Sequence, residues 1–400
     1  MVRKRKLASL LSICKRSERR AQGTFHEAAT VLLATVLLAT VLLGNAVKAD
    51  TVVGLISRTT SILFYLKGIS MKAAFITQTG SPEVIQYGEV EKPQVKAEEV
   101  LVKVGAVSVN PIDTYIRNGA NYWPLPNPFI LGCDLAGTVV EVGSGVTQFK
   151  VGDRVWGSNQ GLLGRQGTFA EYCAVDAKWL YRTPDNVPDA DAAACALVGI
   201  TAHLGLFLSG RLKSGETIFV RGGTGGVGAM VLQMARAVGA TVITTAGSPE
   251  KAERCKQLGA QHVIEYRTCA WDAEVAKIAP GGVDLFWETL REPDFDVAVS
   301  LLAPRGRMIL MAGREARPAF PVGPFYVKGC SLHGFAMFKA TADEQAAAAA
   351  EINQWLSEGK LKAQIDRVLP LSQARESHQL QEANTLRKEG CLSGKIVLKP

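Results

Sequence analysis

A glycine-rich stretch in the middle of the chain limits the fold more than any other feature. FVRGGTGGVGAM, residues 219–230, holds five glycines in twelve positions, directly after an apolar run. Gly223-Thr224-Gly225-Gly226-Val227-Gly228 fits the spacing G-x-G-x-x-G, with a strand predicted before it and a helix after it. This context predicts a dinucleotide-binding βαβ unit. A P-loop would need Lys and then Ser or Thr after the last glycine, where this chain has Ala229 and Met230.

Each glycine of the motif has an expected task. Gly223 should permit the tight turn, Gly225 should let the backbone approach a pyrophosphate, and Gly228 should let helix and strand pack closely. The free N–H groups at the helix start then favour an anion. Turn glycines without a ligand are the alternative.

The end of the next predicted strand indicates which nucleotide binds. TVITTA, residues 241–246, runs into Gly247-Ser248-Pro249-Glu250-Lys251, with no acid at the tip of the strand. An acid there would accept from a ribose 2′-OH and repel a 2′-phosphate. We therefore expect Ser248 and Lys251 to bind the 2′-phosphate of NADPH. A solvated charge on a helix face is the alternative for Lys251.

The rest of the chain predicts an α/β protein with two kinds of sheet. Short strands with Gly and Pro turns continue from Met71 to about residue 180, which predicts a β-barrel-like region. From about residue 190, strands alternate with helices, which predicts a doubly wound parallel sheet. The last strand, GKIVLKP, suits the first region better. We predict an extension (1–70), a β domain (71–194), a nucleotide domain (195–332) and a return to the β domain (333–400).

Charge and cysteine usage exclude several classes of function. The formal charge is +8, but residues 1–70 hold eleven Lys and Arg against three acids, so the remainder is balanced. A nucleic-acid partner is therefore not expected. The eight cysteines have no C-x-x-C spacing, which argues against a structural zinc site and a disulfide framework.

The first 70 residues allow two interpretations. The segment 28–47 has fifteen apolar residues in twenty, preceded by basic residues and followed by VKAD, as in an export signal or a membrane anchor. However, a chain beginning at Met71 reads as complete. A dispensable leader or mis-assigned start, with a cytoplasmic enzyme, is the alternative that we favour, because a nicotinamide cofactor is scarce outside the cytoplasm.

Several motifs in order resemble one known group across most of 71–400. VNPIDTYIRNG, LGCDLAGTVVEVGSGV, FKVGDRV, GTFAEY, GGTGGVG and GKIVL resemble the medium-chain dehydrogenase/reductase superfamily, and within it the zeta-crystallin-like NADPH:quinone oxidoreductases. The resemblance implies a GroES-like β domain, a Rossmann domain, an active site between them and a homodimer. Its members reduce quinones with NADPH.

The zinc alcohol dehydrogenases of this superfamily are the natural comparison. They hold zinc with residues that match Asn110, Cys133 and a position near Leu197. An amide, one thiol and an alkyl group do not make a catalytic zinc site, which needs three ligand side chains. We therefore expect an enzyme without a metal, acting on quinones or conjugated enones, where the developing negative charge delocalises. Cys133 should be a core thiol.

The resemblance also suggests roles for single residues. It places Asn110, Asp113 and Tyr115 near the nicotinamide, and Tyr122 where enoyl-thioester reductases carry a tyrosine proposed as proton donor. An aromatic wall of the pocket is the alternative for Tyr122. The following residues complete the expected cofactor site: Thr201 beside the nicotinamide, and Tyr266 with Arg267 at the adenosine-phosphate end.

The chain also departs from the family pattern. Arg221 ends the first Rossmann strand, FWETLREPDFD is unusually charged, and Gly313-Arg314-Glu315 replaces a common turn. Substrate choice should therefore be unusual. Quinone reduction is the leading hypothesis. An enone, alkenal or enoyl-thioester reductase is the first alternative, and a non-catalytic NADPH-binding protein, as among lens crystallins, is the second.

Overall fold

The computed structural model describes residues 70–120, 123–387 and 389–400. The described residues divide into two units, one with Ser70–Lys72 and Glu89–Lys92, and the other with Ala73–Gly88 and the residues from Pro93 to Pro400. The sheets, helices and candidate site below lie in the second unit, apart from the ends of β1 (Ser70–Ile76) and β2 (Gln86–Glu91). The predicted apolar segment 28–47 and Tyr122 lie outside the described residues.

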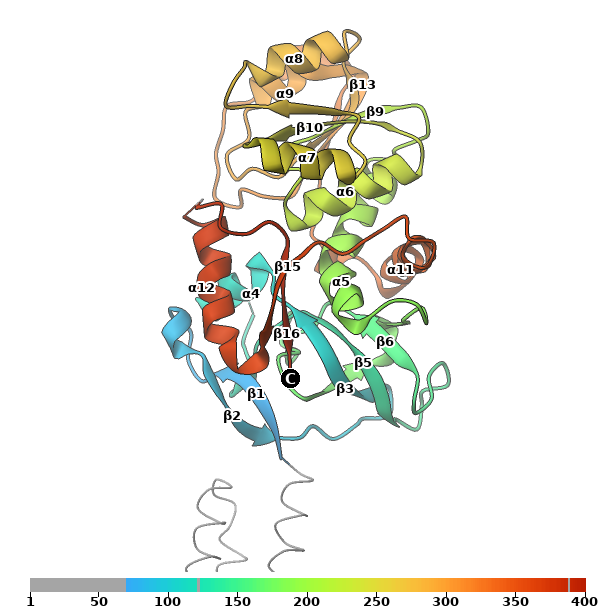
Figure 1. The fold of residues 1–400 in the computed structure, drawn as a ribbon, viewed down its shortest axis with the longest axis vertical. Helices are drawn as coiled ribbons and strands as arrows, with labels where there is room; N and C mark the ends of the chain where they lie inside the picture. The colour runs from blue at the N-terminus through green and yellow to red at the C-terminus, as the bar shows by residue number, and fades with distance from the viewer. Residues whose placement is uncertain (1–69, 121–122, 388) are drawn as a thin grey trace, which may run out of the picture. The chain divides into compact units, whose positions relative to one another are not determined.

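An antiparallel-rich sheet joins the N-terminal half of the second unit to the end of the chain (Figure 1). Its order is β15-β16-β3-β5-β6-β8, and β7 pairs with β3. The bounds are β3 Glu99–Ser108, β5 Asp134–Val142, β6 Arg154–Gly157, β7 Tyr172–Asp176, β8 Leu180–Arg182, β15 Ile365–Pro370 and β16 Lys395–Lys399. Val397 of β16 lies opposite Ser108 of β3, so strands almost 300 positions apart in the sequence pair within one sheet.

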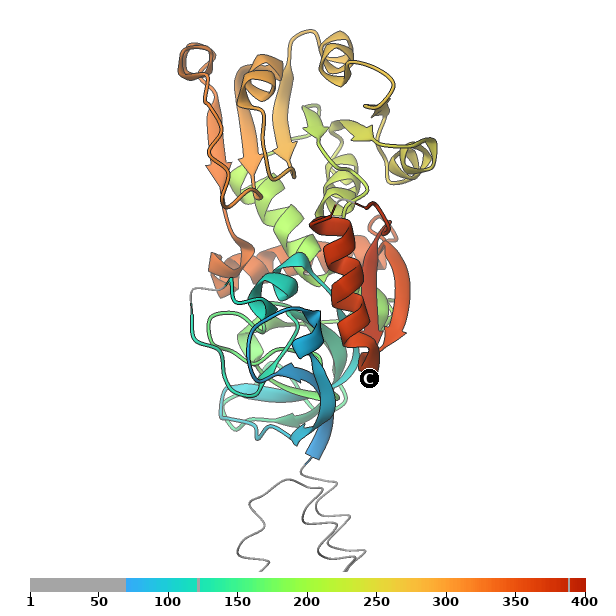
Figure 2. The ribbon, with the colours of Figure 1, turned by 90° about the vertical axis from the view of Figure 1, so that its left-hand side faces the viewer.

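Short elements flank this sheet. β1 pairs with β4 (Phe129–Ile130), and helix α4 (Pro111–Arg117) follows β3 directly, with Pro111 at the first helical position, where its missing N–H costs nothing. Helix α12 (Ala374–Thr385) packs on α4 and β16, as Figures 1 and 2 show from two sides.

The second sheet is parallel and has the order β11-β10-β9-β12-β13-β14. This is the doubly wound dinucleotide-binding order, in which the chain switches direction between the first and the fourth strand, here β9 and β12. The bounds are β9 Thr217–Val220, β10 Thr241–Ala246, β11 His262–Glu265, β12 Val283–Glu288, β13 Leu302–Leu310 and β14 Ser331–Gly334.

Helices cover both faces of the parallel sheet because its strand residues alternate between two cores. Ile218 and Val220 belong to one apolar cluster, and Phe219 to the other. The first cluster includes residues of α5 (Asp189–His203), α6 (Gly226–Ala237), α7 (Pro249–Gln257) and α11 (Ala342–Ser357). The second includes α8 (Trp271–Ile278) and α9 (Phe295–Leu301), and α10 (Val322–Val327) follows β13.

Helix α5 connects the two sheets. It packs on β3, β5 and β6 and also on α6 (Figure 1). With its continuation, Leu204–Ser209, it is long and apolar enough to cross a membrane, but 78% of the apolar window is buried inside the protein, so it is a core helix. The helix runs through the predicted boundary at 194/195, and β14 runs through the one at 332/333. The domain boundaries stay a prediction.

Candidate functional site

The glycine-rich loop follows β9 at the switch point of the parallel sheet and opens helix α6. Gly225 is the N-cap residue of α6 and is exposed, and no side chain caps the helix there. A Cβ added to Gly225 would meet only the Gly222 carbonyl oxygen, at 3.4 Å. The start of this 12-residue helix is therefore accessible at Gly225, and its first N–H groups have no partner within the helix, which suits an anion such as a pyrophosphate.

The other glycines of the loop are required by close packing. Gly222 has a φ of +87°, which L side chains rarely adopt, so this residue makes the left-handed turn that we expected at Gly223. A Cβ on Gly223 would lie 2.5 Å from Thr244 Oγ1 on β10, and a Cβ on Gly228 would lie 2.1 Å from the Gly222 oxygen. Thr224 and Val227 are partly exposed beside Gly225.

The residues predicted for the adenosine end gather at the end of β10. Ser248 caps α7, its Oγ accepting from Lys251 N at 3.3 Å. A Cβ on Gly247 would lie 2.6 Å from the Tyr266 hydroxyl, so Tyr266 lies against this turn, and Arg267 beside it is exposed. A hydrogen bond from the Ser248 hydroxyl lowers the pKa of the Glu250 carboxyl, which is therefore a negative charge at the predicted 2′-phosphate site.

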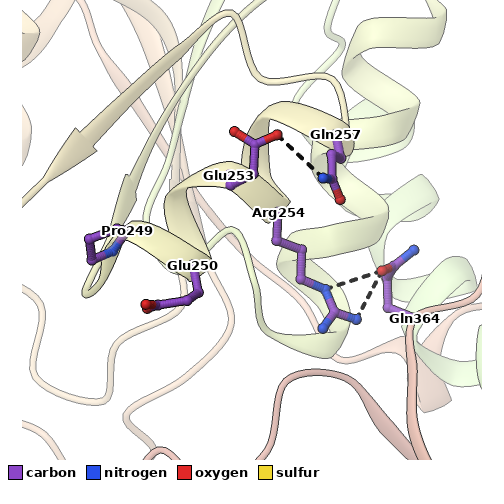
Figure 3. Close-up of a pocket in the computed structure, with 6 residues that line it drawn as sticks. All are labelled: Pro249, Glu250, Glu253, Arg254, Gln257 and Gln364. Atoms are coloured by element: carbon purple, nitrogen blue, oxygen red, sulfur yellow. Dashed lines mark hydrogen bonds between the residues drawn. The ribbon is translucent and has the colours of Figure 1, made fainter.

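A shallow pocket of about 600 Å³ lies along α7, next to this turn (Figure 3). It is lined by Pro249, Glu250, Glu253, Arg254, Gln257 and Gln364. Arg254 donates from Nη2 to Gln364 Oε1 at 2.9 Å, so its guanidinium is already engaged. The pocket contains none of the residues predicted to bind the cofactor, and we do not assign the nucleotide to it.

The second candidate region surrounds the buried carboxylate of Asp134 on β5. Asp134 Oδ2 accepts from Asn110 Nδ2 at 2.8 Å and from Ser108 Oγ at 3.0 Å. Asp134 Oδ1 accepts from Ser158 Oγ at 2.7 Å and from Leu197 N at 3.1 Å. The carboxylate thus fixes β3, the loop after β6 and helix α5 relative to one another.

Asn110 and Asp113, predicted to lie near the nicotinamide, belong to the same buried group. Asp113 Oδ2 accepts from Asn110 N at 2.7 Å, which closes the first turn of α4. Asn110 is 0% exposed and Asp113 is 2% exposed. Both side chains lie beneath the surface. They would therefore act on a bound molecule only indirectly, by positioning the residues to which they are hydrogen-bonded.

Lys395, at the start of β16, completes this group. Its Nζ donates to the Asn110 side-chain oxygen at 2.5 Å and to the Val109 carbonyl oxygen at 2.7 Å. Burial raises the pKa of Asp113 to about 7 and also raises the pKa of Asp134, while the Lys395 ammonium opposes both rises. Burial lowers the pKa of Lys395, and the two carboxylates oppose that change.

The three positions that match zinc ligands in the related dehydrogenases do come together, but their donors do not suit the metal. Asn110 and Leu197 both contact Asp134, and Cys133 precedes it. Burial, with the nearby Asp113 and Asp134 carboxylates, raises the pKa of the Cys133 thiol well above its usual value. Within residues 70–120, 123–387 and 389–400, no group of three His, Cys, Asp or Glu side chains could hold a metal ion.

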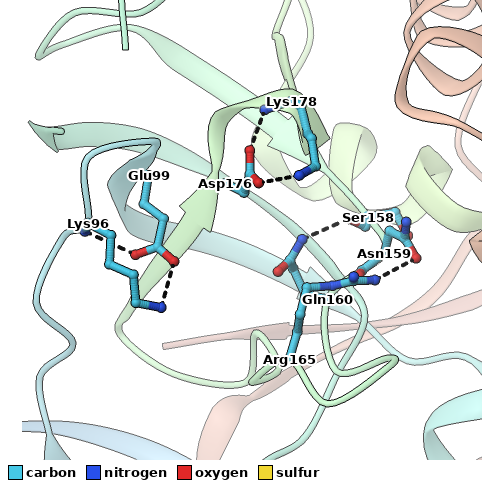
Figure 4. A network of polar contacts seen from close by, with 8 residues as sticks. All are labelled: Lys96, Glu99, Ser158, Asn159, Gln160, Arg165, Asp176 and Lys178. Carbon is cyan, nitrogen blue, oxygen red and sulfur yellow. Dashed lines mark hydrogen bonds and ion pairs between the residues drawn. The ribbon is translucent and has the colours of Figure 1, made fainter. Parts of the chain in front are cut away.

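The loop after β6 is held by polar contacts (Figure 4). Arg165 donates to the Asn159 carbonyl oxygen at 2.9 Å and to its side-chain oxygen at 3.1 Å. Gln160 donates to the Ser158 carbonyl oxygen at 3.2 Å. These contacts fix the loop from which Ser158 reaches Asp134.

The segments that depart from the family pattern contact one another or α4. Arg221 lies over the Trp271 ring at 4.6 Å and 3.4 Å from the buried Glu288 carboxylate. The Arg291 guanidinium donates to the Tyr115 hydroxyl and lies 5.5 Å from the ring centre.

The turn at Gly313 closes onto the same region. A Cβ on Gly313 would lie 2.2 Å from the Arg291 carbonyl oxygen, so this position requires glycine. Arg314 Nη1 donates to the Ala120 carbonyl oxygen at 2.8 Å. Loops of the parallel sheet therefore hold the end of α4 and the residues just before Tyr122. Thr201, predicted beside the nicotinamide, is 5% exposed on α5.

Comparisons with known proteins identify the family. Residues 96–185 match the alcohol dehydrogenase GroES-like domain, and residues 226–354 match the zinc-binding dehydrogenase domain. The quinone oxidoreductase of Sus scrofa is 32% identical over 330 residues, which are 82% of this chain and 97% of that protein. The chain belongs to the quinone oxidoreductase family of the medium-chain dehydrogenases/reductases. This confirms the predicted resemblance and fold class.

Two further members of the superfamily bear on ligands. The Escherichia coli quinone oxidoreductase, solved in complex with NADPH, is 28% identical, with a TM-score of 0.72, over 82% of this chain and 100% of that chain. The 2-methylene-furan-3-one reductase of Solanum lycopersicum is 32% identical over 339 residues, 82% of this chain and 79% of that protein.

The sequence of this quinone oxidoreductase family member did not indicate several residues of the candidate site. Lys395 and Asp134 lie within motifs that indicate the family, but the motifs assign neither to the site, and Arg314 and the segment holding Arg291 stand out only as departures from the family pattern. Lys395 could not be connected to Asn110, since the two are 285 positions apart and no local pattern relates them.

Proposed function

We propose that this chain transfers a hydride from NADPH to a quinone without a metal ion. The observation that carries the proposal is the exposed Gly225 at the head of α6, at the switch point of a sheet with the dinucleotide-binding order. NADPH supplies the hydride, and with one proton from solvent the quinone becomes a hydroquinone and the cofactor becomes NADP⁺.

Each part of the cofactor has candidate residues in this proposal. The pyrophosphate would lie against the N–H groups of the loop Gly223-Thr224-Gly225-Gly226-Val227-Gly228. Ser248 and Lys251 would bind the 2′-phosphate, Tyr266 and Arg267 would border the adenosine end, and Tyr115 with Thr201 would border the nicotinamide. The solved NADPH complex of the Escherichia coli relative supports this choice of cofactor.

A quinone suits the acceptor side because it needs little help from the protein. Negative charge that develops on a quinone delocalises over the ring, so no Lewis acid is needed to stabilise it. The donors at Asn110, Cys133 and Leu197 do not form a zinc site, which agrees with such an acceptor. Asn110 and Asp113 would position the acceptor side from beneath, and Tyr122 would donate a hydrogen bond or proton.

Steady-state NADPH oxidation by the full chain tests this proposal. We expect turnover with 1,4-benzoquinone and 9,10-phenanthrenequinone at a higher kcat/KM than with enones or enoyl-CoA thioesters. NADPH binding without oxidation by any acceptor would instead support the non-catalytic alternative. Absence of NADPH binding would refute both.

Reduction of an activated alkene is the second candidate, supported by the similarity to the tomato 2-methylene-furan-3-one reductase. On this hypothesis Tyr122 supplies the proton that the carbon acceptor requires. We expect Tyr122→Phe to lower kcat for enones by about 10²- to 10³-fold and to leave quinone reduction within about threefold. Tyr87→Phe, at an exposed tyrosine of β2, is the matched control. Equal losses on both acceptors would argue against a role specific to alkenes.

We also propose that the enzyme is a cytoplasmic homodimer, and that it contacts a membrane only if the segment 28–47 is retained. β14 is an edge strand of the parallel sheet, and beside it α10 exposes Val322, Tyr326 and Val327 by 64–74% of their surface. An unpaired edge with apolar neighbours favours pairing with a second copy. Light scattering on purified protein would give the mass, and cell fractionation would give the compartment.

A further inference from the structure

Lys395 is a buried cation that lies between the Asn110–Asp113 turn and the glycine-rich loop. Its side chain is 6% exposed, although a lysine is almost never buried without partners. Its ammonium donates to Asn110 Oδ1 at 2.5 Å and to the Val109 oxygen at 2.7 Å. The group therefore fixes the turn between β3 and α4, where the sequence predicts the acceptor side of the reaction.

The stem of the same side chain reaches the glycine-rich loop. A Cβ added to Gly226 would lie 3.3 Å from Lys395 Cδ and 3.2 Å from Val198 Cγ1. Gly226 is the first residue of α6, directly after the exposed Gly225. The Lys395 stem and Val198 therefore line the space beside Gly226, and a displacement of the loop into that space would press on them, because a close-packed interior transmits such strain.

The charges around Lys395 explain why a cation is retained there. Two buried carboxylates, Asp113 and Asp134, interact with its ammonium. Asp134 also accepts from Asn110 Nδ2 at 2.8 Å, so the Asn110 amide lies between an ammonium on its oxygen and a carboxylate on its nitrogen. Both ends of the amide are satisfied in one orientation only, since a flip would bring the NH₂ group toward the ammonium.

We propose that Lys395 is a positioning residue for hydride transfer, which couples the glycine-rich loop to the Asn110–Asp113 turn. Its stem lies where a side chain on Gly226 of the proposed cofactor loop would touch it, and its ammonium binds the oxygen of the Asn110 amide on the proposed acceptor side. This inference rests on the proposed function. Lys395 is neither among the residues predicted to be catalytic nor among those predicted to bind the cofactor. Its proposed role is to hold other residues in place, and it takes no part in making or breaking a bond.

Three variants and one control test the coupling. Lys395→Met keeps a stem of similar length against Gly226 and removes the ammonium. Lys395→Met with Asp134→Asn also removes one buried carboxylate, which protects the fold from an unpaired charge. Lys395→Arg keeps the charge but changes its geometry. Lys399→Met, at the exposed end of the same strand, is the matched control.

Hydrogen exchange gives a readout that does not depend on turnover. In the wild type, saturating NADPH should slow exchange of the amides in 106–116, because loop ordering is passed on through Lys395. In both Met variants this protection should disappear, although NADPH affinity by fluorescence titration stays within about threefold, because the loop N–H groups that bind the pyrophosphate are intact. Single-turnover hydride transfer should fall by about 100-fold, as for a misplaced reacting pair.

The expected order of rates is wild type and Lys399→Met together, then Lys395→Arg, then the two Met variants. A double variant that folds and keeps both the protection of 106–116 and the wild-type rate would overturn the inference. If the Met variants do not fold, Lys395→Arg becomes the test. Wild-type exchange protection and a wild-type rate in Lys395→Arg would also refute the proposal, because arginine places its charge differently. A wild type that does not bind or oxidise NADPH would refute the proposed function instead.

Discussion

The Ser248 hydroxyl both caps α7, accepting from Lys251 N at 3.3 Å, and hydrogen-bonds to the Glu250 carboxylate. A 2′-phosphate in this position would be attracted by the positive charge of Lys251 and repelled by the negative charge of Glu250. We expect Lys251→Met to weaken NADPH binding by about 10-fold or more, as for loss of a charged hydrogen bond, without changing NADH binding. Glu250→Gln should strengthen NADPH binding. Fluorescence titration with both nucleotides measures this, and Lys256→Met on the same helix is the control.

At the scale of single residues, the sequence indicated which residues belong to the candidate site better than it indicated how deeply they are buried and what they contact. The motif VNPID indicated Asn110 and Asp113, but their complete burial depends on Asp134, Lys395 and the loop at Ser158, which come from distant parts of the chain. The turn glycine was displaced by one position, to Gly222, because spacing alone does not say which glycine has a positive φ and which one lacks room for a side chain.

The glycines at the start of α6 give a prediction about the loop and helix as one element. Gly225→Ala adds a methyl group in open space, with φ at −71°, so the free energy of unfolding should change by less than about 1 kcal/mol. The same methyl group would obstruct a pyrophosphate, so NADPH affinity should fall at least 10-fold. Gly228→Ala places a Cβ 2.1 Å from the Gly222 oxygen and should cost about 1–3 kcal/mol of stability.

Thermal unfolding and NADPH titration of this matched pair separate the two effects. The loop is a binding element if Gly225→Ala keeps its stability and loses the nucleotide. A Gly225→Ala variant with wild-type NADPH affinity would mean that the pyrophosphate lies elsewhere.

Among the elements themselves, local patterns predicted most of the strands and helices, since alternation and helical periodicity are local. The pairing of β16 with β3 and the order of the six parallel strands depend on contacts across the chain. The β-strand pattern of the last segment suggested that β16 joins the first sheet, and the family resemblance suggested the order of the parallel strands. Helix α8 is short and only Val275 of its eight residues is fully buried, so its apolar pattern is weak.

For the whole molecule, the stability of the fold should depend on pH in part through the buried His378. His378 of α12 is 0% exposed, neither ring nitrogen has a hydrogen-bond partner among the described residues, and Phe169 packs against the ring at 6.1 Å. Burial, with the nearby Arg117 guanidinium, lowers the pKa of His378 to about 3. The folded state therefore holds this ring neutral over a range in which the unfolded chain takes up a proton.

The sign follows from proton uptake. Above about pH 6.5, His378 is neutral in both states and its contribution is fully present; as the pH falls from 6.5 toward 3, only the unfolded state gains the proton, and stability is lost. The loss at pH 5 should be about 2 kcal/mol. Asp113 has the opposite sign, because its raised pKa makes the folded state take up a proton first, so wild type alone would mix the two effects.

Urea unfolding of wild type and His378→Phe at pH 7.5 and pH 5 isolates the histidine, since Asp113 is common to both proteins. Phenylalanine keeps a ring against Phe169 and has no group to protonate, so the variant should gain about 2 kcal/mol relative to wild type on going from pH 7.5 to pH 5. His262→Asn, at an exposed position of β11, should leave the pH dependence as it is in the wild type. An equal response in His378→Phe and wild type would show that the ring reaches solvent and is protonated in the folded protein.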